Sequence, residues 1–249
     1  MAHQLRAQSI IGFAPLVAEL GGDAQQLLRS AGLDPAELEQ PDIYISHRAF
    51  IQLLEDAASK LRCPDFGLRL LDRQDLSVLG PIALAAQHAA DLLEALDCFA
   101  RYIHVQGSAL RLYLLPQADP GQVMIAVDLR LRRQIARRQQ VELAVGLAHK
   151  AIDLLTGGRC KPLAICLPHS RIAPLRRRAR VLGVSRAISS ACTPFASRRA
   201  STSVTLISGW KVRSRSSSTS RANSARIRYF RQAATHIRAR ASVIPASAK

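Results

Sequence analysis

The histidines of this chain do not combine with acidic residues into a pattern typical of metal binding. Five of them are spread along residues 47–169: His47, His88, His104, His149 and His169. No two lie four residues apart on one predicted helix with a carboxylate beside them, as a helical zinc motif requires. We therefore expect surface or half-buried histidines and no metal site.

Patterns for nucleophilic catalysis and phosphate binding are missing as well. The sequence contains no Gly-x-Ser-x-Gly motif, which would place a serine on a sharp strand-to-helix turn. Gly157 and Gly158 are not followed by the Lys-Ser of a phosphate-binding loop, so we interpret them as the end of a helix. The adjacent acids Glu55 and Asp56 are expected on a solvated helix surface. We predict no enzyme activity and no cofactor.

A dense group of basic side chains precedes and opens a predicted long helix. It consists of Arg130, Arg132, Arg133, Arg137 and Arg138. One interpretation is that these arginines contact DNA phosphates or a neighbouring domain. The other is a solvated helix end, although cations are mildly unfavourable at a helix N-terminus. The sequence leaves both interpretations open.

The net charge of +17 belongs entirely to the C-terminal part of the 249-residue chain. Residues 1–172 carry 18 basic and 18 acidic side chains, whereas residues 173–249 carry 17 basic and no acidic ones. Such a segment would attract any polyanion by counterion release, in a salt-dependent way. Phosphate contacts alone specify no sequence, so we expect only non-specific DNA binding from it.

The cysteines and the hydropathy pattern indicate a cytoplasmic protein. The five cysteines are scattered and form no Cys-x-x-Cys pair, which suits a reducing compartment better than a disulfide framework. No stretch approaches the ~18–20 uncharged apolar residues that a membrane-spanning helix needs. We expect no membrane association.

The first part of the chain, up to about residue 106, shows the apolar spacing of helices. In residues 46–61, Phe50, Leu53, Leu54 and Ala57 form a single stripe behind Ser46, a good N-cap residue. The predicted helices span residues 5–20, 24–31, 46–61, 65–73, 81–90 and 91–106. Asp23 with Gln26, and Asp91 with Glu94, have the spacing of capping boxes.

The period then changes from 3.6 to 2. Residues 109–115 and 123–128 alternate apolar and polar side chains around a turn-rich loop, which predicts a β-hairpin. A long helix is predicted over 131–156 and a third strand over 162–167. The predicted class is α+β, with a mainly helical first half, then a hairpin, a long helix and a further strand.

Residues 173–249 have a different composition, with 15 Arg, 15 Ser, 14 Ala and no acid. The best apolar run, Val204 to Trp210, is isolated. A segment of this kind buries too little apolar surface to offset its ordering entropy. We expect a folded domain over 1–175 and a disordered tail over 176–249.

Several stretches, taken in order, resemble the amino-terminal effector domain of AraC-type bacterial transcriptional regulators, the arabinose-binding-like subgroup. They are Gly32-Leu33-Asp34-Pro35 with Leu38 and Pro41-Asp42; Ser46 to Ala58; Asp65 to Leu70; Leu79-Gly80 with Leu92 to Tyr102; and Leu163 to His169 followed by Pro174. Each is mostly apolar spacing, and their order and separation over residues 5–175 carry the resemblance.

This resemblance implies a homodimeric domain that senses a small-molecule effector and regulates transcription. Effector pockets are mostly apolar with a few placed polar groups. Polar and aromatic residues flanking the predicted hairpin are the candidates: Arg101, Tyr102, His104 and Tyr113.

The chain departs from the family after residue 175. Relatives would continue into a helix-turn-helix domain of ~100 residues, whereas residues 176–249 show no pair of amphipathic helices joined by a turn. We expect a truncated regulator, with a slip of the reading frame near Leu175-Arg176. The alternative is a complete nucleic-acid-associated protein, with a folded module and a functional basic tail.

Overall fold

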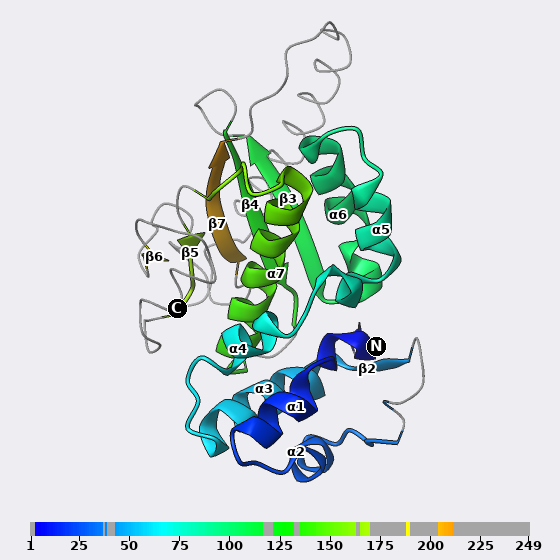
Figure 1. Ribbon diagram of the computed structural model, residues 1–249, viewed down its shortest axis with the longest axis vertical. Coiled ribbons are helices and arrows are strands. Elements are labelled where there is room, and N and C mark those ends of the chain that lie inside the picture. The colour runs from blue at the N-terminus through cyan, green and yellow to red at the C-terminus, as the bar shows by residue number, and fades with distance from the viewer. Residues whose placement is uncertain are drawn as a thin grey trace, which may run out of the picture.

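The computed structural model describes residues 3–36, 38, 43–116, 122–131, 135–162, 165–169, 188–189 and 204–211. Figure 1 shows helices α1 to α3 and strand β2 gathered at one end of the molecule. Helices α5 and α6 lie at the other end beside a sheet, and α7 lies along that sheet. The predicted α+β class is confirmed.

The N-terminal segment differs from the single helix predicted over residues 5–20. It contains β1 (Gln4–Arg6), the 3-10 helix η1 (Ala7–Ile10) and α1 (Phe13–Glu19). Strand β1 pairs antiparallel with β2 (Tyr44–Ser46), so Leu5 faces Ile45. Gly12, with φ of 83°, separates η1 from α1 in a conformation that residues with a Cβ rarely adopt. The helical prediction was wrong here because the partner of this strand lies far outside the local window of sequence.

The predicted helix starts at Asp23, Ser46 and Asp91 are confirmed. These side chains accept hydrogen bonds from the backbone N–H groups of Gln26, Ala49 and Glu94, respectively. They open α2 (Ala24–Ser30), α3 (His47–Lys60) and α6 (Leu92–Gln106). Between α3 and α6 lie α4 (Phe66–Asp72), η3 (Leu76–Leu79) and α5 (Pro81–Gln87).

The predicted hairpin forms strands β3 (Leu110–Pro116) and β4 (Gln122–Leu129). Leu112 lies opposite Val127 and Leu114 opposite Ile125, which puts the predicted apolar side chains on one face. That face packs against α6 and α7 through a cluster that includes Leu96, Ile125 and Val145.

Part of the segment for which we expected no structure belongs to this sheet. Strand β7 (Val204–Lys211) pairs antiparallel with β4, and the strand order is β3-β4-β7. This stretch, isolated in the sequence, therefore has a partner in a much earlier part of the chain. Short β5 (Ile165–Cys166), inside the strand predicted over 162–167, pairs in parallel with β6 (Ile188–Ser189). The rest of residues 176–249 lies outside the described residues.

Helix α7 (Arg138–Thr156) begins at Arg138 instead of the predicted residue 131 and ends at Gly157, as expected. It approaches α4 closely at two glycines. A Cβ on Gly67 would lie 2.3 Å from the backbone oxygen of Gln139, and one on Gly146 would lie 2.1 Å from Cδ2 of Leu71. At Gly67 the facing atom belongs to the backbone, so glycine is needed there because the contact leaves no room for a methyl group.

Candidate functional site

A cavity lies at the junction between the two ends of the molecule. Leu5, Ser9 and Phe50 reach it from the N-terminal end, and residues of η3, α6, β3, β4 and α7 complete its wall. About 80 Å³ inside is available to the centres of water-sized spheres. One water molecule needs ~10–15 Å³ on this measure, so the space accommodates several waters or one small ligand.

The wall of the cavity is almost entirely apolar. Most of its side chains are aliphatic, alanine or phenylalanine, and the polar ones are Ser9, Gln74, Gln106, Arg111 and Gln140. Among the wall residues that the structure describes, none is acidic. Such a wall suits a small organic molecule that is positioned by a few polar contacts.

Three glutamines in this wall carry buried oxygens that have no hydrogen-bond partner. They are Gln74, Gln106 and Gln140, with exposed fractions of 2%, 3% and 5%, and in each the Oε1 atom is unpaired. Buried polar atoms are nearly always hydrogen-bonded in folded proteins, so three exceptions around one cavity call for an explanation.

Two of these side chains connect the cavity to the N-terminal segment. The Nε2 group of Gln74 donates to the backbone oxygens of Ser9 and Ile11, both at 2.9 Å. The Nε2 group of Gln106 lies 3.0 Å from the hydroxyl of Ser9. These contacts hold η1 over the cavity.

None of the four effector-binding candidates lines this cavity. Arg101, Tyr102 and His104 lie on the outer face of α6, where Arg101 pairs with Asp97 at 2.7 Å. Phe99 and Ile103, on the opposite face of the same helix, line the cavity instead. Tyr113 alternates in β3 with the cavity residue Leu112, so it lies on the other face of the sheet. A role for the four in effector binding stays a prediction.

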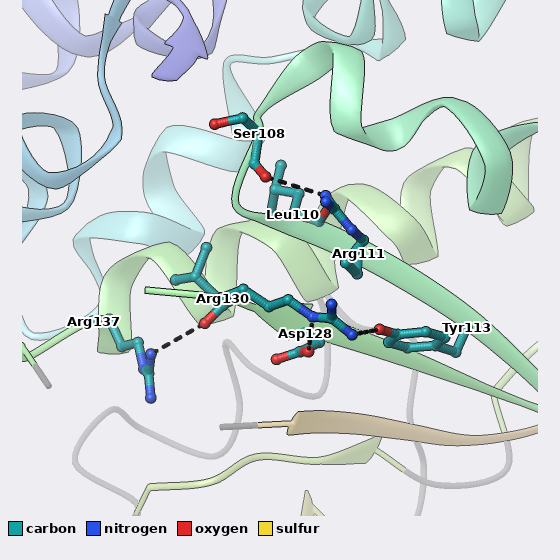
Figure 2. Close-up of polar contacts among 8 residues, drawn as sticks. Ser108, Leu110, Arg111, Tyr113, Asp128, Arg130 and Arg137 are labelled. Atoms are coloured by element: carbon teal, nitrogen blue, oxygen red, sulfur yellow. Dashed lines mark hydrogen bonds and ion pairs between the residues drawn. The ribbon is translucent and has the colours of Figure 1, made fainter. Parts of the chain in front are cut away.

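Tyr113 belongs to a separate polar cluster around a buried carboxylate, Asp128 (Figure 2). Arg130 donates through Nε to Asp128 Oδ2 at 3.1 Å and through Nη2 to the hydroxyl of Tyr113. Burial raises the pKa of Asp128, although Arg130, Arg137 and Arg111 pull it lower. Arg130 and Arg137 of the predicted basic cluster are therefore engaged beside an acid. Arg132 and Arg133 of that cluster lie outside the described residues.

The histidines are more varied than expected. His47 is fully buried and neither ring nitrogen has a hydrogen-bond partner. Burial lowers its pKa to about 4, so it is neutral at physiological pH. His88 and His104 are exposed, as predicted. Within the described part of the chain, no three His, Cys, Asp or Glu residues gather in a way that could hold a metal ion.

The cavity glutamines were missed because no local pattern distinguishes them. Gln106 is the last residue of α6, Gln140 lies in the first turn of α7, and Gln74 follows α4. Polar residues at element ends are normally solvated. Only the packing of the two ends of the molecule against each other makes these three side chains buried.

Comparison with known proteins agrees with the resemblance. Residues 21–203 match the family described as the arabinose-binding domain of AraC transcription regulators, N-terminal. The chain is 32% identical over 168 residues to the HTH-type transcriptional regulator VirS of Mycobacterium tuberculosis, covering 68% of the chain and 49% of VirS. It is 27% identical over 170 residues to the ornithine utilization regulator of Pseudomonas aeruginosa, covering 68% of the chain and 50% of that regulator.

The chain thus spans about half the length of the curated relatives it matches. The family match extends past the boundary predicted at residue 175, as far as residue 203. No helix in the described residues is long and apolar enough to cross a membrane. With most of its length matched to that family, the chain belongs to the AraC transcription regulators, through their N-terminal arabinose-binding-type domain.

Proposed function

We propose that this chain is the effector-sensing part of a cytoplasmic AraC-type transcriptional regulator and that the effector binds in the cavity between its two ends. The observation that carries this proposal is the apolar cavity with three buried, unpaired glutamine oxygens. The cavity wall joins η1 and α3 to α6, α7 and the sheet, so a ligand there would contact both ends at once.

Filling the cavity tests the proposal. Ala148, on the cavity side of α7, is replaced by leucine, and Ala85, exposed on α5, is replaced by leucine as the control. A ligand at 100 times its Kd stabilises the folded state by ~2.7 kcal/mol, which corresponds to ~5–10 °C in a chain of this size. Fractions of a bacterial metabolite extract are screened for such a rise in Tm.

An extract fraction that contains the effector is expected to raise the Tm of the wild type and of Ala85→Leu but not that of Ala148→Leu. Equal stabilisation of all three proteins would place the ligand elsewhere. No active fraction from cells grown on varied carbon and nitrogen sources would contradict effector sensing by this chain.

Coupling to transcription is tested with a hybrid regulator. The chain up to Lys211 is joined to the DNA-binding half of the P. aeruginosa ornithine utilization regulator and tested on that regulator's promoter. We expect a ligand identified above to change reporter output at least threefold, and Ala148→Leu to remove the response. Unchanged output with normal hybrid levels would argue against a regulatory role.

We further propose that the chain forms homodimers, as the family resemblance implies. Sedimentation equilibrium over a hundredfold range of protein concentration measures this directly. A single species of 27.2 kDa at every concentration would contradict the dimer.

A second function is favoured by the charge distribution alone. With 17 basic and no acidic side chains after residue 172, the C-terminal segment would bind nucleic acid non-specifically. In filter binding against operator and random DNA, affinity for both should fall by orders of magnitude between about 50 and about 200 mM salt. A sequence preference that survives high salt would contradict both this idea and truncation.

The proposed slip of the reading frame near residue 175 is tested by translating the gene downstream in all three frames.

A further inference from the structure

The unpaired oxygens in the cavity specify the chemistry of what can bind there. Gln74 is oriented unambiguously, because its Nε2 group donates to two backbone carbonyls. Turning the amide over would place its oxygen against both of them. Its Oε1 atom is therefore a true acceptor that lacks a donor. The Oε1 atoms of Gln106 and Gln140, as placed, are also buried without a donor, although the only described partner of the Gln106 amide is a hydroxyl, which can donate as well as accept. A buried acceptor without a donor destabilises the folded protein.

The rest of the wall excludes strongly charged and highly polar molecules. The described residues that line the cavity include no carboxylate, so a ligand ammonium group would find no counter-charge among them. Within the part of the wall that the structure describes, Arg111 is the one cation, and its Nη1 group already donates to the backbone oxygens of Ser108 and Leu110. Apart from the five polar residues, the described side chains of the wall are aliphatic or aromatic, so most of a sugar's surface would lie against groups that cannot hydrogen-bond its hydroxyls.

We propose that the cavity binds a compact, uncharged, mainly apolar molecule that donates O–H or N–H hydrogen bonds to these glutamine oxygens. This inference rests on the proposed function and names the class of its effector. The space of about 80 Å³ that is open to the centres of water-sized spheres is smaller than the ~150 Å³ of an apolar cavity that binds benzene, so the ligand is no larger than a single small ring. The class differs from both the pentose and the amino acid that appear in the names of this family and its relatives.

Three ring compounds of similar size test the inference on the full chain. Phenol donates a hydrogen bond, anisole has the same ring and oxygen but no donor, and benzoate carries a negative charge. Binding is measured by titration followed in ¹⁵N–¹H correlation spectra. We expect phenol to bind at least tenfold more tightly than anisole, and benzoate to bind no better than anisole. Ala148→Leu should abolish binding of all three.

Gln140→Leu is the diagnostic variant, with the exposed Gln87→Leu as its control. Removing an unpaired buried acceptor should raise the Tm of the ligand-free protein by a few degrees. The same change should reduce the preference for phenol over anisole at least threefold. Gln87→Leu should change neither quantity. The rise in Tm also shows that any lost binding is not a failure to fold.

Several outcomes would overturn the inference. Equal affinities for phenol and anisole would show that donors are not selected, and tightest binding of benzoate would show that Arg111 selects an acid. If no probe binds, ordered water alone satisfies the glutamines. In each of these cases the proposed function still stands if the metabolite screen yields a ligand that Ala148→Leu rejects. Failure of that screen, or a hybrid regulator that does not respond to the ligand, defeats the proposed function itself.

Discussion

At the scale of single residues, the molecule buries polar groups in several separate places. The carboxylate of Asp128 lies among arginines on one face of the sheet, whereas the three glutamines face the cavity from the other side. His47, at the start of α3, is a third case, because both of its ring nitrogens are buried without partners. Burial stabilises the uncharged imidazole, and this has a consequence for stability at low pH.

The pKa of His47 falls from its usual 6.5 to about 4 on folding. The unfolded chain therefore takes up this proton at a higher pH than the folded one, and acidification from pH 6.5 to 4 favours unfolding. At ~1.4 kcal/mol per pKa unit, the loss from this residue is about 3 kcal/mol. Urea unfolding of the wild type and His47→Leu at pH 7, 5.5 and 4.5 measures it.

The difference in unfolding free energy between the two proteins should shift in favour of His47→Leu as the pH falls. His88→Leu, at an exposed site, is the control and should follow the wild type. If the unfolding free energies of the wild type and His47→Leu change in parallel with pH, the lowered pKa of His47 is refuted.

At the scale of elements, the start of α7 is fixed by other helices rather than by its own cap. Arg137, its N-cap residue, makes no side-chain capping bond. Instead, Glu55 of α3 accepts a hydrogen bond from the backbone N–H of Gln139 at 2.8 Å. The Gln139 side chain accepts from the N–H of Gly67 and donates to the backbone oxygen of Pro64. The corner between α3 and α4 thereby positions α7 and, with it, Gln140.

Removing the acceptor supplied by Glu55 should weaken this corner. Glu55→Ala leaves the N–H of Gln139 without its partner and should cost ~1–2 kcal/mol of unfolding free energy, as for a lost helix cap. Glu55→Gln keeps an acceptor oxygen and should cost less than half as much. Chemical denaturation compares the two variants, and equal losses would show that the hydrogen bond is unimportant.

The two glycines at the contact of α4 and α7 should respond differently to alanine. Alanine normally stabilises a helix by ~1 kcal/mol relative to glycine. At Gly67 the added methyl group meets the backbone of Gln139, which cannot rotate away, so we expect a net loss of more than ~2 kcal/mol. At Gly146 it meets the flexible end of Leu71, and the loss should be smaller. Thermal unfolding of Gly67→Ala and Gly146→Ala measures the two losses. A Gly67→Ala protein that is more stable than the wild type would contradict the close contact.

At the scale of the whole molecule, the central strand of the sheet depends on a distant part of the chain. β4 lies between β3 and β7, and β7 begins only at Val204, whereas β4 ends at Leu129. Without β7, one edge of β4 would present unpaired backbone groups, which destabilise a sheet and promote aggregation. The domain boundary predicted at residue 175 can be examined on this basis.

Two shortened chains make the comparison. A chain ending at Lys211 keeps β7 and should unfold at about the same temperature as the whole chain. A chain ending at residue 175 should unfold at least ~5 °C lower and aggregate more readily. Equal melting temperatures would support the boundary at 175 and assign β7 no part in stability.

The sequence by itself determined the features that rest on local spacing. The caps at Asp23, Ser46 and Asp91, the hairpin of β3 and β4 and the end of α7 at Gly157 follow from interactions within a few residues, so short windows of sequence contain them. Family membership likewise followed from the order of such segments.

Only the tertiary structure decided what depends on contacts between distant residues. The pairing of β1 with β2 and of β7 with β4 joins segments that lie far apart in the chain. The cavity is made by residues from Leu5 to Ile152, and Gln74, Gln106 and Gln140 become part of it only because the two ends of the molecule pack together. A glutamine at the end of a helix has the same local sequence whether it faces solvent or a ligand; its burial is a property of the assembled fold.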